Sequence, residues 1–184
     1  MKFTESRVPG AWIIDITAIH DDRGFFAMTW LPDQFRKHGI DPALAQCNLA
    51  FNHKRGTLRG MHFQAAPEPD AKLVRCLSGR MFDVAVDIRP GSPTRGRWAA
   101  VELAAGDGRS LFVPAGFAHG FVTLEDDTTV FYMMGAAYRP ALARGFRWDD
   151  PRVAIAWPVA PQTISERDRA LPALDDLDEA ELAR

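Results

Sequence analysis

The chain has 184 residues, of which 47% are hydrophobic and 25% charged, and it carries a formal net charge of -2 at pH 7. This is the balance of an ordinary globular protein with one sizeable core, and it lacks the basic excess that favours nucleic acid or an anionic membrane surface. No stretch approaches the ~20 apolar residues of a membrane span, and the N-terminus lacks the apolar run of a secretory signal. We therefore expect a single cytoplasmic domain over residues 1–184 that binds neither nucleic acid nor a membrane.

The two cysteines, Cys47 and Cys76, show neither the spacing of metal ligands nor a disulfide framework. Free thiols fit a cytoplasmic protein, and the alternative is a single disulfide in a secreted one. A reactive-thiol enzyme has little support, because Cys76 lies in an apolar stretch and no cationic neighbourhood is evident around Cys47. The cysteines therefore give no lead to the function.

The N-terminal part predicts a strand, a turn and a short helix. Residues 13–19 alternate between apolar and polar side chains, and residues 21–24 (Asp-Asp-Arg-Gly) are typical of a turn. Residues 32–38 begin with proline and predict a short helix that stops at Gly39.

The next segment, residues 56–64, predicts a strand that carries possible catalytic groups. Arg59 and His62 would point to opposite faces of an ideal strand, but Gly60 predicts a bulge or a close backbone approach that brings them together. An imidazole can take a proton near neutral pH, and the ammonium of Lys72, which opens the next apolar run, can hold the resulting negative charge. A packed histidine beside a surface arginine and lysine is an equally good interpretation of this segment alone.

Short strands separated by turns fill the middle of the chain. We expect them at residues 73–77, 82–88, 98–103, 110–113, 120–124 and 128–134. The strand at 82–88 alternates strictly, with Asp83 and Asp87 on the face opposite Phe82, Val84, Val86 and Ile88. This regular spacing favours a sandwich or barrel over alternating β and α units.

The C-terminal part is acidic and carries spaced leucines. Leu171, Leu174, Leu177 and Leu182 predict one side of a short helix. We expect the carboxylates of the tail, at about residues 172–184, to form a solvated face, because runs of like charge usually stay exposed.

Seven segments together resemble the dTDP-4-dehydrorhamnose 3,5-epimerase family. They follow in the family's order between about residues 10 and 170, at residues 22–26, 58–64, 72–75, 82–94, 114–121, 144–151 and 164–168. The resemblance implies an all-β fold, a double-stranded β-helix or cupin-like jelly roll with short peripheral helices. It also implies a homodimer in which the N-terminal strand region, with Arg23 and Phe26, reaches the site of the partner.

The resemblance implies a substrate in which a 4-keto-6-deoxyhexose is linked to a nucleotide, as in dTDP-4-dehydro-6-deoxyglucose. The ketone acidifies the hydrogens at C3 and C5, because removing either leaves an enolate. Such an enzyme needs a base, a cation or donor near the ketone oxygen, and an acid across the ring, with no cofactor and no metal.

Four residues match the family's catalytic groups. His62 matches the base, Asp168 the carboxylate that holds its imidazole, and Lys72 the cation beside the sugar oxygen. Tyr132 matches the acid, and strand alternation places it on the side opposite Phe131. Without the resemblance, packing would be the better interpretation of this tyrosine.

Further residues match the family's substrate contacts. Arg59 and Arg23 match groups that bind the diphosphate, for which a guanidinium is well shaped. The remaining matches are Gln46 and Asn48 at the nucleotide and sugar end, Tyr138 stacking near the base, Phe26 from the partner, and His119 in a supporting role.

The outer pocket departs from the family pattern at four positions. Met28 stands where the family usually has a glutamate that helps to recognise the thymine edge, and a thioether is only a weak acceptor. The other departures are Cys47 for an acidic residue, Met133 for a lysine and Ala137 for a tyrosine. These changes leave open the nucleotide, the exact sugar, and whether one or two carbons are inverted.

Three alternatives remain beside this interpretation. A metal-binding cupin usually needs an HxH motif, which the five scattered histidines do not form. A non-catalytic jelly roll that binds sugar nucleotides would tolerate loss of the base or the acid. A single-centre epimerase or ketoisomerase would act on another nucleotide sugar with the same catalytic groups.

Overall fold

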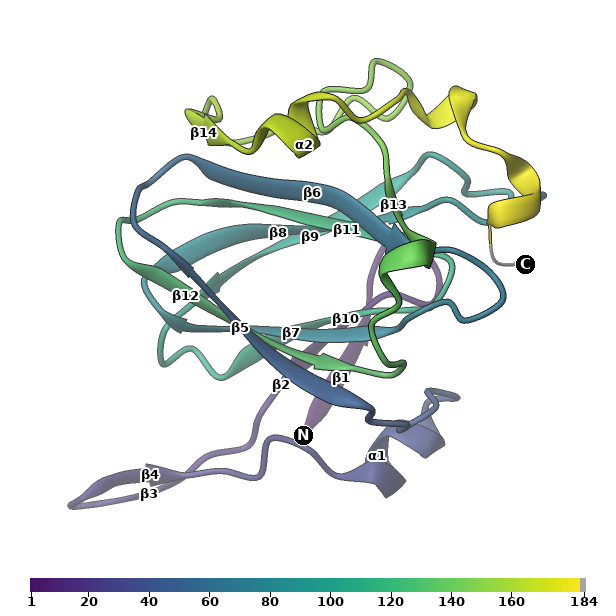
Figure 1. Cartoon of the computed structure of the whole chain (residues 1–184). Coiled ribbons are helices and arrows are strands. Elements are labelled where there is room, and N and C mark those ends of the chain that lie inside the picture. Colours follow the sequence, from purple (N-terminus) through teal and green to yellow (C-terminus); the bar gives the residue numbers. More distant parts are fainter. Residues whose placement is uncertain (183–184) are drawn as a thin grey trace.

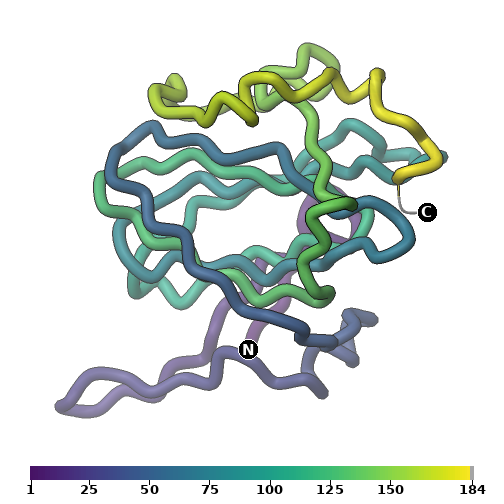
Figure 2. Tube along the Cα trace, in the orientation of Figure 1, coloured from purple at the N-terminus to yellow at the C-terminus, as the bar shows by residue number. Residues whose placement is uncertain are grey.

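Two facing antiparallel sheets dominate the computed structural model, which describes residues 1–182 (Figures 1 and 2). In spatial order, the first sheet contains β1 (Lys2–Glu5), β2 (Trp12–Asp15), β10 (Arg109–Val113), β7 (Lys72–Ser78), β12 (Thr128–Met134) and β5 (Gln46–Asn52). The second contains β13 (Ala143–Gly145), β6 (Thr57–Gln64), β11 (Phe117–Thr123), β8 (Arg80–Asp87) and β9 (Trp98–Ala104), with β14 (Thr163–Ile164) parallel to β6. This arrangement confirms the predicted jelly roll.

The remaining elements are peripheral. A two-stranded hairpin of β3 (Ile19–Asp21) and β4 (Gly24–Phe26) projects away from the sheets (Figure 1). The helical elements are α1 (Pro32–Lys37), α2 (Glu166–Arg169) and the 3-10 turns η1 (Pro140–Leu142), η2 (Leu174–Asp176) and η3 (Glu179–Glu181). None of the helices within residues 1–182 is long and apolar enough to cross a membrane.

Three apolar clusters lie between the sheets and on parts of their two outer faces. One lies between the sheets and includes Val74 and Val130 from the first sheet and Phe121 from the second. A second covers the outer face of the second sheet, where Leu174 and other C-terminal side chains pack (Figure 1). A third lies under α1 on the first sheet. Both sheets therefore hold side chains rigidly on the face that lines the interior.

The alternation predicted in β8 is confirmed, and both of its faces are buried. Val84 and Val86 belong to the outer cluster, whereas Ala85 belongs to the cluster between the sheets. Asp83 and Asp87 are both fully buried. The polar face of this strand therefore looks into the protein interior and not into solvent.

The predicted strand over residues 13–19 is wrong in extent, because β2 ends at Asp15 and β3 begins only at Ile19. The chain leaves the first sheet between them to form the hairpin, whose tip is the predicted turn at residues 21–24. The predicted helix at residues 32–38 is confirmed as α1. Strand β5 was not predicted, since exposed apolar side chains such as Leu49 and Phe51 obscure its alternation.

The predicted C-terminal helix is wrong, because the chain forms two isolated 3-10 turns, η2 and η3. The separated turns set Leu174 and Leu182 into the outer cluster, and a continuous helix would bring several carboxylates into repulsive i,i+3 and i,i+4 positions. Most tail carboxylates are exposed, as expected, but three of them pair with arginines: Asp175 with Arg152, Glu179 with Arg95 and Glu181 with Arg144. Residues 183 and 184 of the predicted domain and tail lie outside the described residues.

Candidate active site

A bulge in β6 presents His62. His62 is the cross-strand partner of His119, whereas Arg59 is the partner of Phe121, so β6 has one more residue than β11 between the two pairs. Gly60 lies in this bulge with a φ of +139°, and a Cβ there would lie 2.6 Å from the Cα of Gly120. The bulge predicted from Gly60 is therefore confirmed, and it depends on a residue without a side chain.

Asp168 holds the imidazole of His62. Its Oδ1 lies 2.8 Å from Nε2 of His62, and its Oδ2 accepts a hydrogen bond of 3.2 Å from the Gly60 backbone N–H. The carboxylate comes from α2, whose N-cap residue Ser165 accepts a hydrogen bond from the Asp168 N–H. The structure thus joins two predicted residues 106 positions apart.

The environment of Asp168 favours its ionised form. Burial alone would raise the pKa of Asp168, but the hydrogen bonds and charge from His62, with the Gly60 N–H, outweigh burial and hold this pKa below its usual value. An ionised carboxylate only accepts hydrogen bonds, so Nε2 of His62 carries a proton and Nδ1 keeps its lone pair. Because 39% of the His62 side chain is exposed, a substrate can reach this base.

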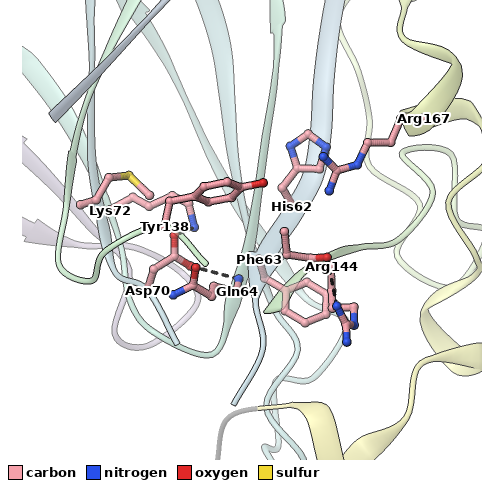
Figure 3. A pocket seen from close by; sticks show the side chains of 10 residues that line it. His62, Phe63, Gln64, Asp70, Lys72, Tyr138, Arg144 and Arg167 are labelled. Carbon is pink, nitrogen blue, oxygen red and sulfur yellow. Dashed lines mark hydrogen bonds and ion pairs between the residues drawn. The ribbon is translucent and has the colours of Figure 1, made fainter. Parts of the chain in front are cut away.

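Lys72 lines the same pocket as His62. It opens β7 in the first sheet, is 6% exposed, and its Nζ lies 2.7 Å from Oδ2 of Asp70. The pocket has a volume of about 160 Å³, well below the roughly 300–1,000 Å³ of a typical ligand site, so it fits part of a ligand such as a sugar ring. Figure 3 shows Asp70, Tyr138 and Arg167 around the same space.

A second histidine–carboxylate pair lies deeper. Nε2 of His119 is 2.7 Å from Oδ1 of Asp83, and both side chains are buried. Burial raises the pKa of Asp83, although the charge and hydrogen bond of His119 oppose this. The ring of Tyr132 meets that of His119 edge to face, with centroids 5.9 Å apart.

Tyr132 is held in its neutral form. Burial raises the pKa of its hydroxyl, the charge of Asp83 raises it further, and Arg59 opposes the change. Tyr132 packs against the cluster between the sheets, so its ring faces the interior. A neutral phenol in this place can donate a proton.

Several predicted binding residues lie together on the edge strand β5 and its neighbours. Asn48 is the cross-strand partner of Tyr132, and Gln46 that of Met134, which also pairs with Lys72. The amide of Gln46 donates to Oδ1 of Asn48 at 3.1 Å and accepts from the backbone N–H of Tyr138 at 2.8 Å.

Arg59 lies beside this edge strand. Its Nε donates to Oδ1 of Asn52 at 2.8 Å, and its side chain is exposed. The guanidinium is therefore anchored on one side and available to an anion on the other.

The structure does not bring Arg23 and Phe26 to the pocket of the same chain. Both lie exposed on the β3–β4 hairpin (Figure 1), where Arg23 pairs with Asp21. Met28 follows the hairpin and is also exposed. The expectation that the hairpin serves a neighbouring subunit stays a prediction.

Sequence reasoning missed most of the other residues that line this pocket, among them the charged Asp70 and Arg167. Asp70 stands two positions before Lys72, and Arg167 directly precedes Asp168 and reaches toward His62 (Figure 3). Their nearness to predicted catalytic residues was the available signal.

The structure also bears on the thiol and metal alternatives. Burial raises the pKa of Cys76 to about 11, with nearby carboxylates adding to the effect, which disfavours its thiolate. Within residues 1–182, no three His, Cys, Asp or Glu side chains are grouped as metal ligands.

Comparisons with known proteins point to one family. The sequence model of the dTDP-4-dehydrorhamnose 3,5-epimerase family matches residues 5–176. A dTDP-4-dehydrorhamnose 3,5-epimerase of Sinorhizobium fredii is 46% identical over 158 residues, which cover 85% of this chain and 81% of that protein.

Two solved structures are similar over almost the whole chain. The dTDP-6-deoxy-D-glucose-3,5-epimerase of Legionella pneumophila, in complex with dTDP-4-keto-L-rhamnose, is 34% identical and has a TM-score of 0.93 over 100% of this chain and 97% of that one. A 3'-monoepimerase of Streptomyces bikiniensis, in complex with dTDP-quinovose, is 36% identical and has a TM-score of 0.86 over 93% of this chain and 87% of that one.

Proposed function

Because the chain belongs to the dTDP-4-dehydrorhamnose 3,5-epimerase family, we propose that it inverts both C3 and C5 of dTDP-4-dehydro-6-deoxyglucose through enolate intermediates. The chain is an isomerase, and its substrate is a dTDP-linked sugar. The observation that carries the proposal is the 2.8 Å pair of His62 and Asp168 in a pocket that also contains Lys72.

We assign the base to His62. Nδ1 of His62 removes the hydrogen from C3 or C5, and the imidazolium that forms is stabilised by the ionised carboxylate of Asp168. The positive charge that His62 gains on proton transfer is thus balanced by the negative charge of Asp168. This assignment is supported by the exposure of His62, since Asp168 itself is almost fully buried.

We assign enolate stabilisation to Lys72 and reprotonation to Tyr132. His62 lies on the second sheet, whereas Lys72 and Tyr132 lie on the first, and the two sheets face each other. A sugar between the sheets therefore meets a base from one side and an acid from the other, which inversion at a carbon requires. The buried ammonium of Lys72 supplies positive charge near the ketone oxygen as the enolate forms.

We place the nucleotide along β5. Arg59 binds the diphosphate, Gln46 and Asn48 bind the nucleotide and sugar end, Tyr138 stacks near the base, and His119 supports the interior of the site. At the thymine edge, Met28 offers only a weak acceptor in place of the hydrogen-bonding glutamate of the family pattern.

We propose a homodimer in which Arg23 and Phe26 of one protomer complete the site of its partner. Large apolar side chains are exposed on the hairpin and on β5, with Ile19, Phe26 and Leu49 each about two-thirds exposed (67%, 68% and 67%). Such a surface is typical of an interface between subunits. Mixing inactive Arg23→Ala and His62→Ala chains, with refolding, should restore part of the activity if sites are shared; no restoration would contradict the exchange.

Proton NMR of the enzyme with dTDP-4-keto-6-deoxyglucose in heavy water tests the reaction. Deuterium at both C3 and C5, with the rhamno configuration, supports the proposal, and deuterium at one carbon only supports a single-centre epimerase. The similarity to a 3'-monoepimerase is the observation that supports the single-centre epimerase as a second candidate. Binding without exchange would instead indicate a ligand-binding protein. The cytoplasmic location stays a prediction.

A further inference from the structure

The loop between β6 and β7 places a second buried carboxylate beside Lys72. Asp70 is 7% exposed, and its Oδ1 accepts a hydrogen bond of 3.1 Å from the backbone N–H of Gln64 at the end of β6. Its Oδ2 lies 2.7 Å from Nζ of Lys72 at the start of β7. The carboxylate is therefore fixed by one strand and directed at the first residue of the next.

The ammonium of Lys72 keeps hydrogens free for a ligand. Its Nζ contacts Oδ2 of Asp70 at 2.7 Å and makes no other hydrogen bond within residues 1–182, so at least two of its three N–H groups have no acceptor. Figure 3 shows Asp70 and Lys72 on the side of the pocket opposite His62. A buried donor without an acceptor is costly, so a ligand oxygen in the pocket would satisfy it.

We propose that Asp70 is a positioning residue for the epimerase reaction, which keeps the buried ammonium of Lys72 charged and aimed at the ketone oxygen of the sugar. The inference rests on the proposed role of Lys72. A buried ammonium without a counter-ion tends to lose its proton, whereas a carboxylate at 2.7 Å retains it. The contact with Asp70 leaves the remaining N–H groups of Lys72 for the substrate.

The other charged groups near Lys72 do not replace Asp70. His62, Arg144 and Arg167 line the pocket from β6, β13 and α2, and Tyr138 follows β12; none of these side chains is an anion at neutral pH. Asp41 borders a smaller cavity on Lys72, but it is exposed and its Oδ1 accepts the backbone N–H of Ala43.

A double-mutant cycle tests whether Asp70 acts through Lys72. Asp70→Asn should lower kcat by at least about tenfold with little change in KM, because the cation acts on the developing enolate more than on bound substrate. In a Lys72→Met background, the same change should have almost no effect on kcat. If Asp70→Asn lowered kcat by the same factor with and without Lys72, the inference would be overturned. The double variant removes both partners, so it also guards against misfolding caused by a buried unpaired charge.

Glu68→Gln is the matched control. Glu68 lies in the same loop, and its side chain forms a half-exposed pair of 3.0 Å with Arg139. Its kcat should equal that of the parent enzyme. A loss as large as that of Asp70→Asn would mean that the loop responds to any lost carboxylate, and would overturn the assignment to Asp70.

Amine labelling provides a readout that does not depend on turnover. Acetic anhydride acylates only the neutral amine, so the pH at which half of Lys72 reacts, measured by peptide mass spectrometry, reports its charge. Asp70→Asn should move this midpoint down by at least about one pH unit. An unchanged midpoint would overturn the inference. If the parent protein lacked epimerase activity, the proposed function would fail, while the labelling would still decide whether Asp70 keeps Lys72 charged.

Discussion

Two histidine–carboxylate pairs lie on neighbouring strands of this protein and differ in exposure and in ionisation. His62 and His119 are cross-strand partners on β6 and β11, and each has a carboxylate oxygen within 2.8 Å of Nε2. The His62 side chain is 39% exposed, whereas that of His119 is 6% exposed. A substrate can reach the His62–Asp168 pair, which we call the outer pair. The His119–Asp83 pair, the inner pair, is buried in the protein interior.

The two carboxylates also differ in their ionisation. Hydrogen bonds outweigh burial at Asp168 and lower its pKa, whereas burial prevails at Asp83 and raises its pKa. Asp83 is more completely buried than Asp168 and receives fewer hydrogen bonds, and both differences raise its pKa relative to that of Asp168. The following predictions separate the two pairs experimentally.

Removing the outer imidazole should have the largest effect. His62→Ala should lower kcat by about 10³-fold or more, since no other group in the pocket can take its place as a neutral base. The thermal midpoint should fall only modestly, because the buried Asp168 loses the hydrogen bond with His62 but keeps that of the Gly60 backbone N–H. Steady-state kinetics and calorimetry check both. His38→Ala, an exposed histidine outside the pocket, is the control and should keep its kcat; a retained kcat in His62→Ala would refute the assigned base.

Breaking the inner pair should instead destabilise the fold. Asp83→Ala leaves a buried histidine without its acceptor, and we expect the free energy of unfolding to fall by about 2–4 kcal/mol. Urea unfolding followed by tryptophan fluorescence measures this change. If stability were unchanged and only kcat fell, the inner pair would have to act directly in the reaction.

Tyr132→Phe should separate exchange from inversion. The variant keeps the ring packing against His119 but loses the proton donor, so we expect kcat for inversion to fall by about 10²-fold with unchanged stability. Deuterium from heavy water should still enter at the carbon that His62 deprotonates, with retention of configuration. Equal losses of exchange and inversion would contradict the division between base and acid.

Asp168→Asn should have a smaller effect on turnover than His62→Ala. The amide keeps an acceptor for His62 but removes the charge that balances the imidazolium, so we expect kcat to fall by about 10- to 100-fold. A parallel Asp33→Asn change, at an exposed surface pair on α1, should leave kcat unaltered. A loss as large as that of His62→Ala would show that the carboxylate does more than support the base.

The smallest expected effect is a difference in how stability depends on pH. Asp168 has a folded pKa below its unfolded value, so it contributes stability that is present above the unfolded pKa near 3.8 and is lost as the pH falls through the folded pKa. Asp83 has a folded pKa above its unfolded value, so it destabilises the fold increasingly as the pH rises through 3.8 toward the folded pKa.

Urea midpoints between about pH 3 and 6 test these opposite signs. On acidification, Asp168→Asn should lose less stability than the parent protein. Asp83→Asn should lose more, because it lacks the relief that protonation of Asp83 gives the parent. Curves for both variants that run parallel to that of the parent would mean that neither carboxylate changes its pKa on folding.

Features that depend on near neighbours in the sequence were predictable. The alternation in β8 follows from the pleat of a strand, and the bulge in β6 was indicated by a single glycine, Gly60, inside a strand pattern. Helix α1 begins with a proline and ends before Gly39, both of which are local signals. Each of these patterns is set within a few residues, so one sequence is enough.

Features that depend on distant segments were not. The contact between His62 and Asp168 followed from the family resemblance and not from spacing, because nothing local relates two residues so far apart. Asp70 was missed because a carboxylate in a loop is usually exposed, and here the loop turns it inward. The spaced leucines of the tail were misinterpreted as a helix because their spacing does not reveal that two separate 3-10 turns set Leu174 and Leu182 against the second sheet.

The order in which the chain is made has a consequence for the outer pair. Strand β14, which runs parallel to the start of β6, leads directly into α2 and Asp168. All the other strands of both sheets precede β14 in the chain, so His119 and its carboxylate on β8 are synthesised before Asp168. His62 gains its carboxylate only when this last segment is made. A chain truncated before residue 163 should therefore keep the residues of the inner pair and lose the carboxylate of the outer one.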